Sequence, residues 1–98
     1  MDYSVLSTIF GDSVQVKLVE FFLVNTEGMY KLTEIAKELA ISHSRVHDLI
    51  DQLVKMRLIF ETKSKRIRLF EFNPDHPVSK RLQELYRITR AFKVASDN

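Results

Sequence analysis

Apolar residues recur every three or four positions along much of the chain, a spacing typical of amphipathic helices. The clearest case is the stretch 42–56, in which five apolar residues follow the 3.6-residue period of a helix: Val46, Leu49, Ile50, Leu53 and Met56. Similar spacing predicts helices in the segments 3–10, 14–25 and 34–40. Gly11 ends the first of these segments, and Ser13, Thr33 and Ser42 are placed to cap the helices that follow them.

The pattern changes after residue 57. The stretch LIFETKSKRIRLFEFN is rich in β-branched and aromatic residues and predicts a β-hairpin with a polar turn at TKSK, residues 62–65. We expect Ile59, Ile67 and Leu69 on one face of this hairpin and Phe60, Phe70 and Phe72 on the other. Because both faces are apolar near the base, the pattern predicts that both are covered there while the polar tip projects. A shorter extended segment, MYKL at 29–32, precedes the third helix.

The last segment predicts one long helix that starts after NPDHP. Its apolar side follows heptad spacing through Val78, Leu82, Leu85, Thr89 and Phe92. The seam spans only about two heptads, which is too short for an independent coiled coil. The helix therefore packs either on the core of its own chain or on the same helix of a second copy.

Composition narrows the possible classes. The chain has 98 residues, which is the size of one domain, and it contains no cysteine, so disulfides, thiolate metal sites and cysteine nucleophiles are excluded. A cysteine-free chain without a signal peptide or a membrane-length apolar run fits the cytoplasm. Residues 55–68 carry six basic residues against one acidic residue, Glu61, on a chain whose net charge is only +2. Such a local cluster indicates an anion-binding surface.

The segment LTEIAKELAISHSRVHDLIDQL, from Leu32 to Leu53, resembles a helix-turn-helix. With the basic hairpin KSKRIRLFEFNPDHP after it, the region 9–90 resembles the winged helix-turn-helix DNA-binding regulators of the ArsR and MarR type, including archaeal ones. The fold class that this implies is α+β, mostly α, with a short three-stranded antiparallel sheet and a long C-terminal helix. The single domain 1–98 would hold a helix-turn-helix at about 32–56, a wing at about 58–72 and a C-terminal dimerisation helix at about 75–95.

The resemblance implies a transcriptional regulator that binds double-stranded DNA. Its recognition helix, 42–56, would enter the major groove, and its basic wing, 62–68, would lie along the backbone or in the minor groove. Arg45 is suited to pair with guanine, and Ser44 at the helix N-terminus is suited to bind phosphate. The residues expected to contact DNA are His43, Ser44, Arg45, His47, Asp48, Lys63, Lys65, Arg66 and Arg68.

Four residues depart from the pattern of these regulators. Ala40 and Arg57 stand where glycine is usual, which predicts left-handed backbone that costs about 1 kcal/mol at each position. Asp48 and Asp51 put negative charge on a helix that should approach phosphates. Asp48 is able to accept from cytosine N4, and Asp51 is spaced to pair with His47 or Lys55.

We expect this chain to bind DNA as a homodimer. The predicted interface combines the last helix with the first segment, and its residues are Leu6, Ile9, Leu82, Leu85, Tyr86, Thr89 and Phe92. Two copies would place their recognition helices about 34 Å apart and favour a palindromic site.

Two other functions stay open. His43, His47 and Asp51 lie at i, i+4 and i+8 of one helix, so a metal-responsive regulator is one alternative. A winged-helix protein-interaction module that does not bind DNA is the other, and the two acids favour it. No catalytic constellation, phosphate loop or ligand pocket is evident, so neither an enzyme nor a cofactor is predicted.

Overall fold

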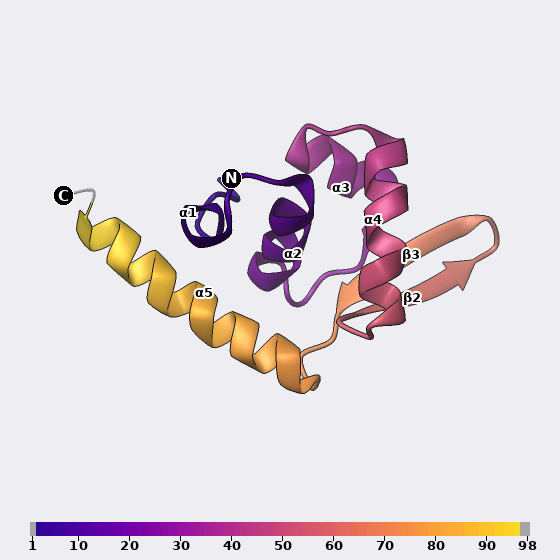
Figure 1. Cartoon of the computed structure of the whole chain (residues 1–98). Coiled ribbons are helices and arrows are strands. Elements are labelled where there is room, and N and C mark those ends of the chain that lie inside the picture. Colours follow the sequence, from indigo (N-terminus) through magenta and orange to yellow (C-terminus); the bar gives the residue numbers. More distant parts are fainter. Residues whose placement is uncertain (1, 97–98) are drawn as a thin grey trace.

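The computed structural model describes residues 2–96, and Figure 1 shows how their helices and strands are arranged. The elements follow in the order α1 (Ser7–Phe10), α2 (Val14–Val24), β1 (Tyr30–Lys31), α3 (Leu32–Leu39), α4 (His43–Lys55), β2 (Ile59–Ser64), β3 (Ile67–Phe72) and α5 (Pro77–Ser96). This order confirms the mostly helical α+β class and the winged-helix arrangement. No helix among residues 2–96 is both long enough and apolar enough to cross a membrane.

Helix α2 lies at the centre of the molecule because its apolar arc is wide. Leu18, Phe21 and Phe22 are almost completely buried. The ring centroid of Phe21 lies 5.1 Å from that of Phe22 and 5.0 Å from that of Tyr30, both in edge-on contacts that aromatic rings prefer. Helices α3, α4 and α5 and strand β3 all contact α2, so a single core organises the whole domain.

A buried carboxylate holds the N-terminal segment against this core. Glu20 of α2 is fully buried and accepts hydrogen bonds from the backbone amides of Val5, at 3.1 Å, and Leu6, at 2.7 Å. The helix predicted over 3–10 is therefore wrong in extent, since α1 spans only Ser7–Phe10. Val5 and Leu6, just before it, form a turn whose amides donate to Glu20.

Two of the three predicted helix caps are confirmed. The Ser13 hydroxyl accepts from the amide of Val16 at 3.1 Å, and the Ser42 hydroxyl accepts from the amide of Arg45 at 3.3 Å. The predicted cap at Thr33 is wrong, because strand β1 runs directly into α3 and the helix begins one residue earlier, at Leu32. The side chain that serves this helix start belongs to Glu34, which accepts from the Lys31 amide at 2.9 Å.

Both predicted left-handed positions are confirmed. Ala40 ends α3 with a φ of 55°, and Arg57 follows α4 with a φ of 65°. At each site the next amide reaches back to close the helix, from Ile41 to the Ala36 carbonyl at 3.0 Å and from Leu58 to the Leu53 carbonyl at 3.1 Å. This is the hydrogen-bond pattern of a Schellman motif, which usually has glycine at the left-handed position.

The wing is a two-stranded hairpin, but its turn is not where the sequence placed it. Strands β2 and β3 pair in register from Ile59 opposite Phe72 to Ser64 opposite Ile67, so the turn consists of Lys65 and Arg66 alone. The turn predicted at residues 62–65 is wrong, since Thr62, Lys63 and Ser64 extend strand β2. Strand β1 pairs with the other edge of β3, which completes the three-stranded antiparallel sheet in the order β1-β3-β2.

This register also corrects the predicted faces of the hairpin. Directly opposed residues share a face, so Ile59 lies with Phe70 and Phe72, and this face is buried against the core. Phe60 lies instead with Ile67 on the other face, where the two residues are 45% and 44% exposed. The expectation that both faces of the base are covered is therefore wrong, because only one face packs on the domain.

Helix α5 runs as a long arm away from the wing (Figure 1). Pro77 is its first residue, and the Nδ1 atom of His76 accepts from the amide of Val78 at 3.1 Å, which caps the helix start. Leu82, Leu85 and Tyr86 pack partly against the core. The described chain is consequently elongated, with principal extents of 48 × 28 × 19 Å.

Candidate nucleic-acid interface

Helix α4 is fixed to the domain by one apolar side. Val46, Ile50 and Leu53 are buried, and they pack in the same core cluster as the apolar residues of α3. The Ser42 cap sets where the helix begins, and the left-handed Arg57 sets where it ends. The opposite side of α4 is therefore held rigidly while facing solvent, which is the arrangement that a recognition helix requires.

The predicted DNA-contacting residues of α4 lie together at its N-terminal end. All five of them have exposed side chains in the structure: His43, Ser44, Arg45, His47 and Asp48. The Arg45 side chain has no carboxylate within 4 Å among the described residues, so its guanidinium is free to reach a ligand. Asp48 has a weak neighbour, because its Oδ1 atom lies 3.8 Å from Nδ1 of His47.

The wing carries three exposed cations beyond its packed base. Lys63 lies on β2, while Lys65 and Arg66 form the two-residue turn. Within residues 2–96 none of the three side chains forms an ion pair shorter than 4 Å. Their positive charge is therefore available to an approaching anion.

Arg68, the fourth predicted cation of the wing, has a different environment. Its Nε atom donates to Oε2 of Glu61 at 2.7 Å, and its Nη2 atom donates to Oε1 of the same carboxylate at 2.9 Å. The same Nη2 atom also donates to Oδ1 of Asp51, on α4, at 2.6 Å. The guanidinium lies 5.0 Å from the ring centroid of Phe70. Arg68 thus joins α4 to the wing.

The electrostatics of this cluster follow from its hydrogen bonds. The bond from Arg68, together with its positive charge, lowers the pKa of Glu61 below the ordinary glutamate value of 4.5. The carboxylates of Glu61 and Asp51 in turn raise the pKa of Arg68. The Arg68 and Glu61 side chains are 26% and 16% exposed, so their charges are partly shielded from water, whereas Asp51 is 54% exposed.

The sequence alone did not reveal this cluster. Asp51 was expected to pair with His47 or Lys55 on its own helix, but it accepts from Arg68, seventeen residues away. Glu61 was noted only as the single acid in a basic stretch. The contact depends on the register of the hairpin, which the sequence placed incorrectly.

The predicted dimer residues fall into three environments. Leu6 is buried in the monomer, with 2% of its surface exposed. Leu82, Leu85 and Tyr86 pack partly on the core of their own chain, and Thr89 is half-buried. Ile9 and Phe92 are 52% and 72% exposed. Nearby apolar side chains that the sequence did not single out are exposed as well, namely Phe10, Ile88 and Val94.

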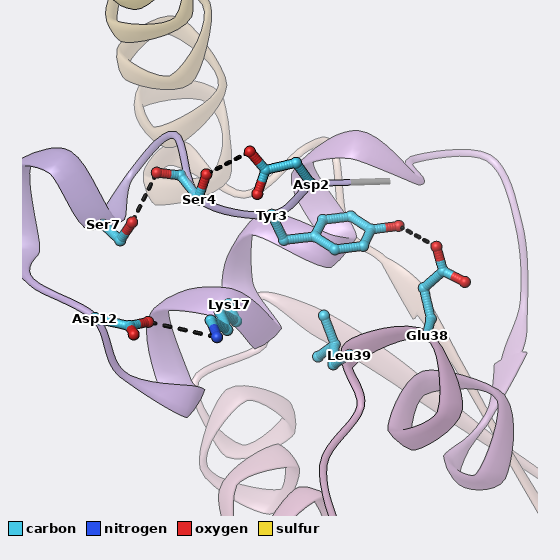
Figure 2. Close-up of a pocket in the computed structure, with 8 residues that line it drawn as sticks. All are labelled: Asp2, Tyr3, Ser4, Ser7, Asp12, Lys17, Glu38 and Leu39. Carbon is cyan, nitrogen blue, oxygen red and sulfur yellow. Dashed lines mark hydrogen bonds and ion pairs between the residues drawn. The ribbon is translucent and has the colours of Figure 1, made fainter.

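A pocket that the sequence did not indicate opens between the N-terminal segment, α2 and α3 (Figure 2). It has a volume of about 390 Å³ and is lined by Asp2, Tyr3, Ser4, Ser7, Asp12, Lys17, Glu38 and Leu39. Its polar groups bond to one another: the Tyr3 hydroxyl donates to Glu38 at 3.1 Å, and Lys17 lies 3.4 Å from Asp12. We assign no ligand to this pocket.

The metal alternative gains no support from the structure. Across residues 2–96, no group of three or more histidine or acidic side chains is arranged to hold a metal ion. Asp51, the third member of the proposed set, is bonded to Arg68.

We compared the sequence and the structure with known proteins. No family model and no curated protein matches the sequence. Among solved structures, the adhesin competence repressor (AdcR) of Streptococcus pyogenes superposes with a TM-score of 0.68 at 19% identity, over 95% of this chain and 68% of that one. MepR, a transcription regulator of the Staphylococcus aureus multidrug efflux pump MepA, gives 0.67 at 17% identity, over 98% and 72%. The chain has the fold of winged-helix transcription regulators.

A third similar structure contains nucleic acid. Lactococcus lactis ZitR, solved in complex with DNA, superposes with a TM-score of 0.63 at 18% identity. The match covers 86% of this chain but only 59% of ZitR, so the described chain corresponds to less than two-thirds of that protein. At these identities the likeness establishes the fold alone.

Proposed function

We propose that this chain is a sequence-specific, DNA-binding transcriptional regulator. The observation that carries the proposal is the pairing of two exposed features on one rigid domain: the polar N-terminal edge of α4 and the three unpaired cations of the wing. The likeness to AdcR and MepR, which are described as regulators, and to ZitR, which is described in complex with DNA, supports it. In this proposal the chain works in the cytoplasm and needs neither catalysis nor a cofactor.

In this proposal α4 enters the major groove. Its 13 residues make a helix about 20 Å long that fits the groove end-on or along it. Arg45 would bind guanine through two hydrogen bonds, and Ser44 with the free amides of the helix start would bind a phosphate. His43 and His47 would contact the flanking bases or phosphates, and Asp48 would accept from cytosine N4.

The wing would supply affinity that depends little on sequence. Lys63, Lys65 and Arg66 would neutralise phosphates along the backbone or in the minor groove, and each contact would release counterions. Arg68 is the exception among the predicted wing cations, since two carboxylates already accept its hydrogen bonds.

We further propose that the regulator is a homodimer joined through α5 and α1. Ile9, Ile88 and Phe92 are more than half exposed, and in the proposed dimer the partner copy would cover them. A two-fold axis there would carry one recognition helix on each side and would favour an inverted-repeat site.

Paired substitutions test the DNA-binding proposal. Arg45→Ala should weaken binding to the preferred duplex by about 1–3 kcal/mol and reduce the preference for it over random duplex. Removing the charges of Lys65 and Arg66 should weaken binding to both duplexes alike and flatten the dependence of affinity on salt. Fluorescence anisotropy across a salt series measures both effects, and equal loss on both duplexes from Arg45→Ala would contradict base reading.

A protein-interaction module is the second candidate, and one observation favours it. Asp48 is exposed on the reading edge, where a carboxylate repels phosphate unless it meets a base. An interaction module should show no salt-dependent affinity for any duplex, so the same titration separates the two candidates.

A further inference from the structure

Of the two acids on the recognition helix, one contacts the wing. The Asp51 carboxylate reaches across to the wing and accepts from Arg68 at 2.6 Å, while Asp48, three residues earlier, is exposed with only His47 nearby at 3.8 Å. The two acids are alike in sequence but differ in their partners. A role for Asp51 therefore has to be sought in the wing that it contacts.

The contact lies where the wing would otherwise lack support. Ile59, Phe70 and Phe72 pack on the core, and β1 pairs with β3 as far as Leu69, whereas Arg68 is the next residue outward and is paired opposite Lys63. A two-stranded hairpin is only marginally stable without other elements to pack on. The Arg68 contacts consequently connect the projecting part of the wing to α4.

The geometry of the contact is directional. Glu61 accepts from both Nε and Nη2 of Arg68, a two-point fork that fixes the plane of the guanidinium. Phe70 lies beside this plane at 5.0 Å, and the Arg68 side chain is 26% exposed. With the guanidinium fixed on the wing, its third bond, to Asp51, fixes the wing relative to α4.

We propose that Asp51 and Glu61 are positioning residues that hold the wing at a set angle to the recognition helix by clamping Arg68, so that both elements meet DNA together. The proposal rests on the DNA-binding function proposed above. In this proposal Arg68 positions the wing, and Lys63, Lys65 and Arg66 contact the phosphates. The proposal also explains why an acid is present on a helix that approaches phosphates.

The direction in which one substitution changes DNA affinity distinguishes this clamp from a simple charge effect. Asp51→Asn removes a negative charge near the DNA, which by charge alone should strengthen binding. If Asp51 positions the wing, the same change should weaken binding by about tenfold, the equivalent of one ordering contact of roughly 1.4 kcal/mol. Asp48→Asn makes the same chemical change on the same helix without touching Arg68. On the random-sequence duplex, where no contact to a particular base is selected, it should follow the charge effect alone and strengthen binding.

Arg68→Lys is the second variant. Lysine keeps the charge but cannot bind Glu61 and Asp51 as a planar fork. A phosphate-contacting Arg68 would tolerate this change with an unaltered salt dependence, whereas the clamp predicts a loss like that of Asp51→Asn. The double variant Asp51→Asn/Arg68→Lys should bind DNA no more weakly than either single variant, because both substitutions break the same contact. The probes are a labelled random-sequence duplex and a duplex selected from a random pool.

A measurement without DNA tests the clamp independently of the DNA-binding function. Because the chain has no cysteine, Ser64→Cys on the wing and Lys37→Cys on α3 give two exposed sites for spin labels. Pulsed electron–electron double resonance measures the distribution of distances between the two labels. This distribution should be narrow in the wild-type background and with Asp48→Asn, and broader with Asp51→Asn and with Arg68→Lys. An unchanged distribution with Asp51→Asn would overturn the clamp. A broadened distribution in a protein that binds no duplex would support the clamp and contradict the DNA-binding proposal.

Discussion

At the scale of single residues, two side chains occupy backbone conformations that favour glycine. Ala40 and Arg57 both close a helix with positive φ, at 55° and 65°. Ala40 lies in the tight turn between α3 and α4, and the Arg57 carbonyl accepts from the Asn73 side chain at 2.8 Å. The surrounding hydrogen bonds keep both residues in place despite the unfavourable backbone.

Glycine should relieve this strain at Arg57. Arg57→Gly is expected to raise the free energy of unfolding by up to about 1 kcal/mol, because glycine adopts the left-handed conformation without a Cβ clash. Urea denaturation measures the change. The control is Lys55→Gly, in the last turn of the same helix with ordinary helical backbone, which should lower stability by a similar amount. Destabilisation by both substitutions would contradict the strain assigned to Arg57.

The residue scale also shows what the sequence was able to predict. Ser13 and Ser42 were identified as caps because a serine just before a helical apolar pattern can accept a hydrogen bond from an amide of the first turn, and this depends only on nearby sequence. Ala40 and Arg57 were identified as left-handed from the resemblance to proteins with glycine there. The partner of Asp51 was not predicted, since it depends on a residue distant in sequence rather than on helical spacing.

At the scale of elements, the helices were easier to predict than the hairpin. Helix α4 has a 3.6-residue period that its burial reproduces, with Val46, Ile50 and Leu53 inside. The hairpin turn has no such signal, because Lys65 takes a φ of 58° without glycine or asparagine to mark it. The polar run before it looked like the turn, and a turn at 62–65 would place Glu61 opposite Arg66 rather than Phe70. The misplaced turn concealed the Glu61–Arg68 pair. The assignment of Ile59 and Phe60 to the wrong faces was a separate error, because a register shift of four residues leaves the faces unchanged.

The clamp should make the wing sensitive to acid. The bond from Arg68 lowers the pKa of Glu61 in the folded chain below 4.5, so the stability that it contributes is complete above that pH and is lost as the pH falls through the lower folded value. Glu61→Gln should therefore be less stable than wild type by about 1 kcal/mol near neutral pH, with the difference shrinking as the pH falls below about 4.5. Urea denaturation at several pH values measures this difference.

Glu27→Gln is the control for the acid experiment. Glu27 is an exposed glutamate outside the wing, so its substitution should leave the acid sensitivity of the wild-type chain in place. A difference between wild type and Glu61→Gln that stays constant with pH would show that the Glu61 charge does not stabilise the fold.

At the scale of the whole molecule, the chain separates two kinds of surface. The wing tip and the start of α4 carry polar and basic groups, although Phe60 and Ile67 are also exposed on one face of the wing, whereas α5 and α1 expose Ile9, Phe10, Ile88 and Phe92. Figure 1 shows that α5 and the wing extend in different directions from the central helices. Such a separation suits a protein that joins a second copy on one side and meets DNA on the other.

The dimer makes a prediction of its own. Phe92 is 72% exposed, and Phe92→Glu should place a charge within the proposed interface and convert the dimer to a monomer. Its affinity for an inverted-repeat duplex should fall with it, because one recognition helix replaces two. Light scattering at micromolar concentration measures the mass. Arg87→Gln, an equal change of charge on another exposed face of α5, should leave the dimer intact; a monomeric wild-type chain would contradict the interface.

The most direct test of DNA binding is selection of bound sequences from a pool of random duplexes. The proposal predicts enrichment of an inverted repeat whose half-sites lie about one helical turn, roughly 34 Å, apart. It also predicts that the affinity for the selected duplex falls steeply as salt is added. A pool that shows no enriched sequence, together with no salt-dependent binding to any duplex, would contradict the central claim.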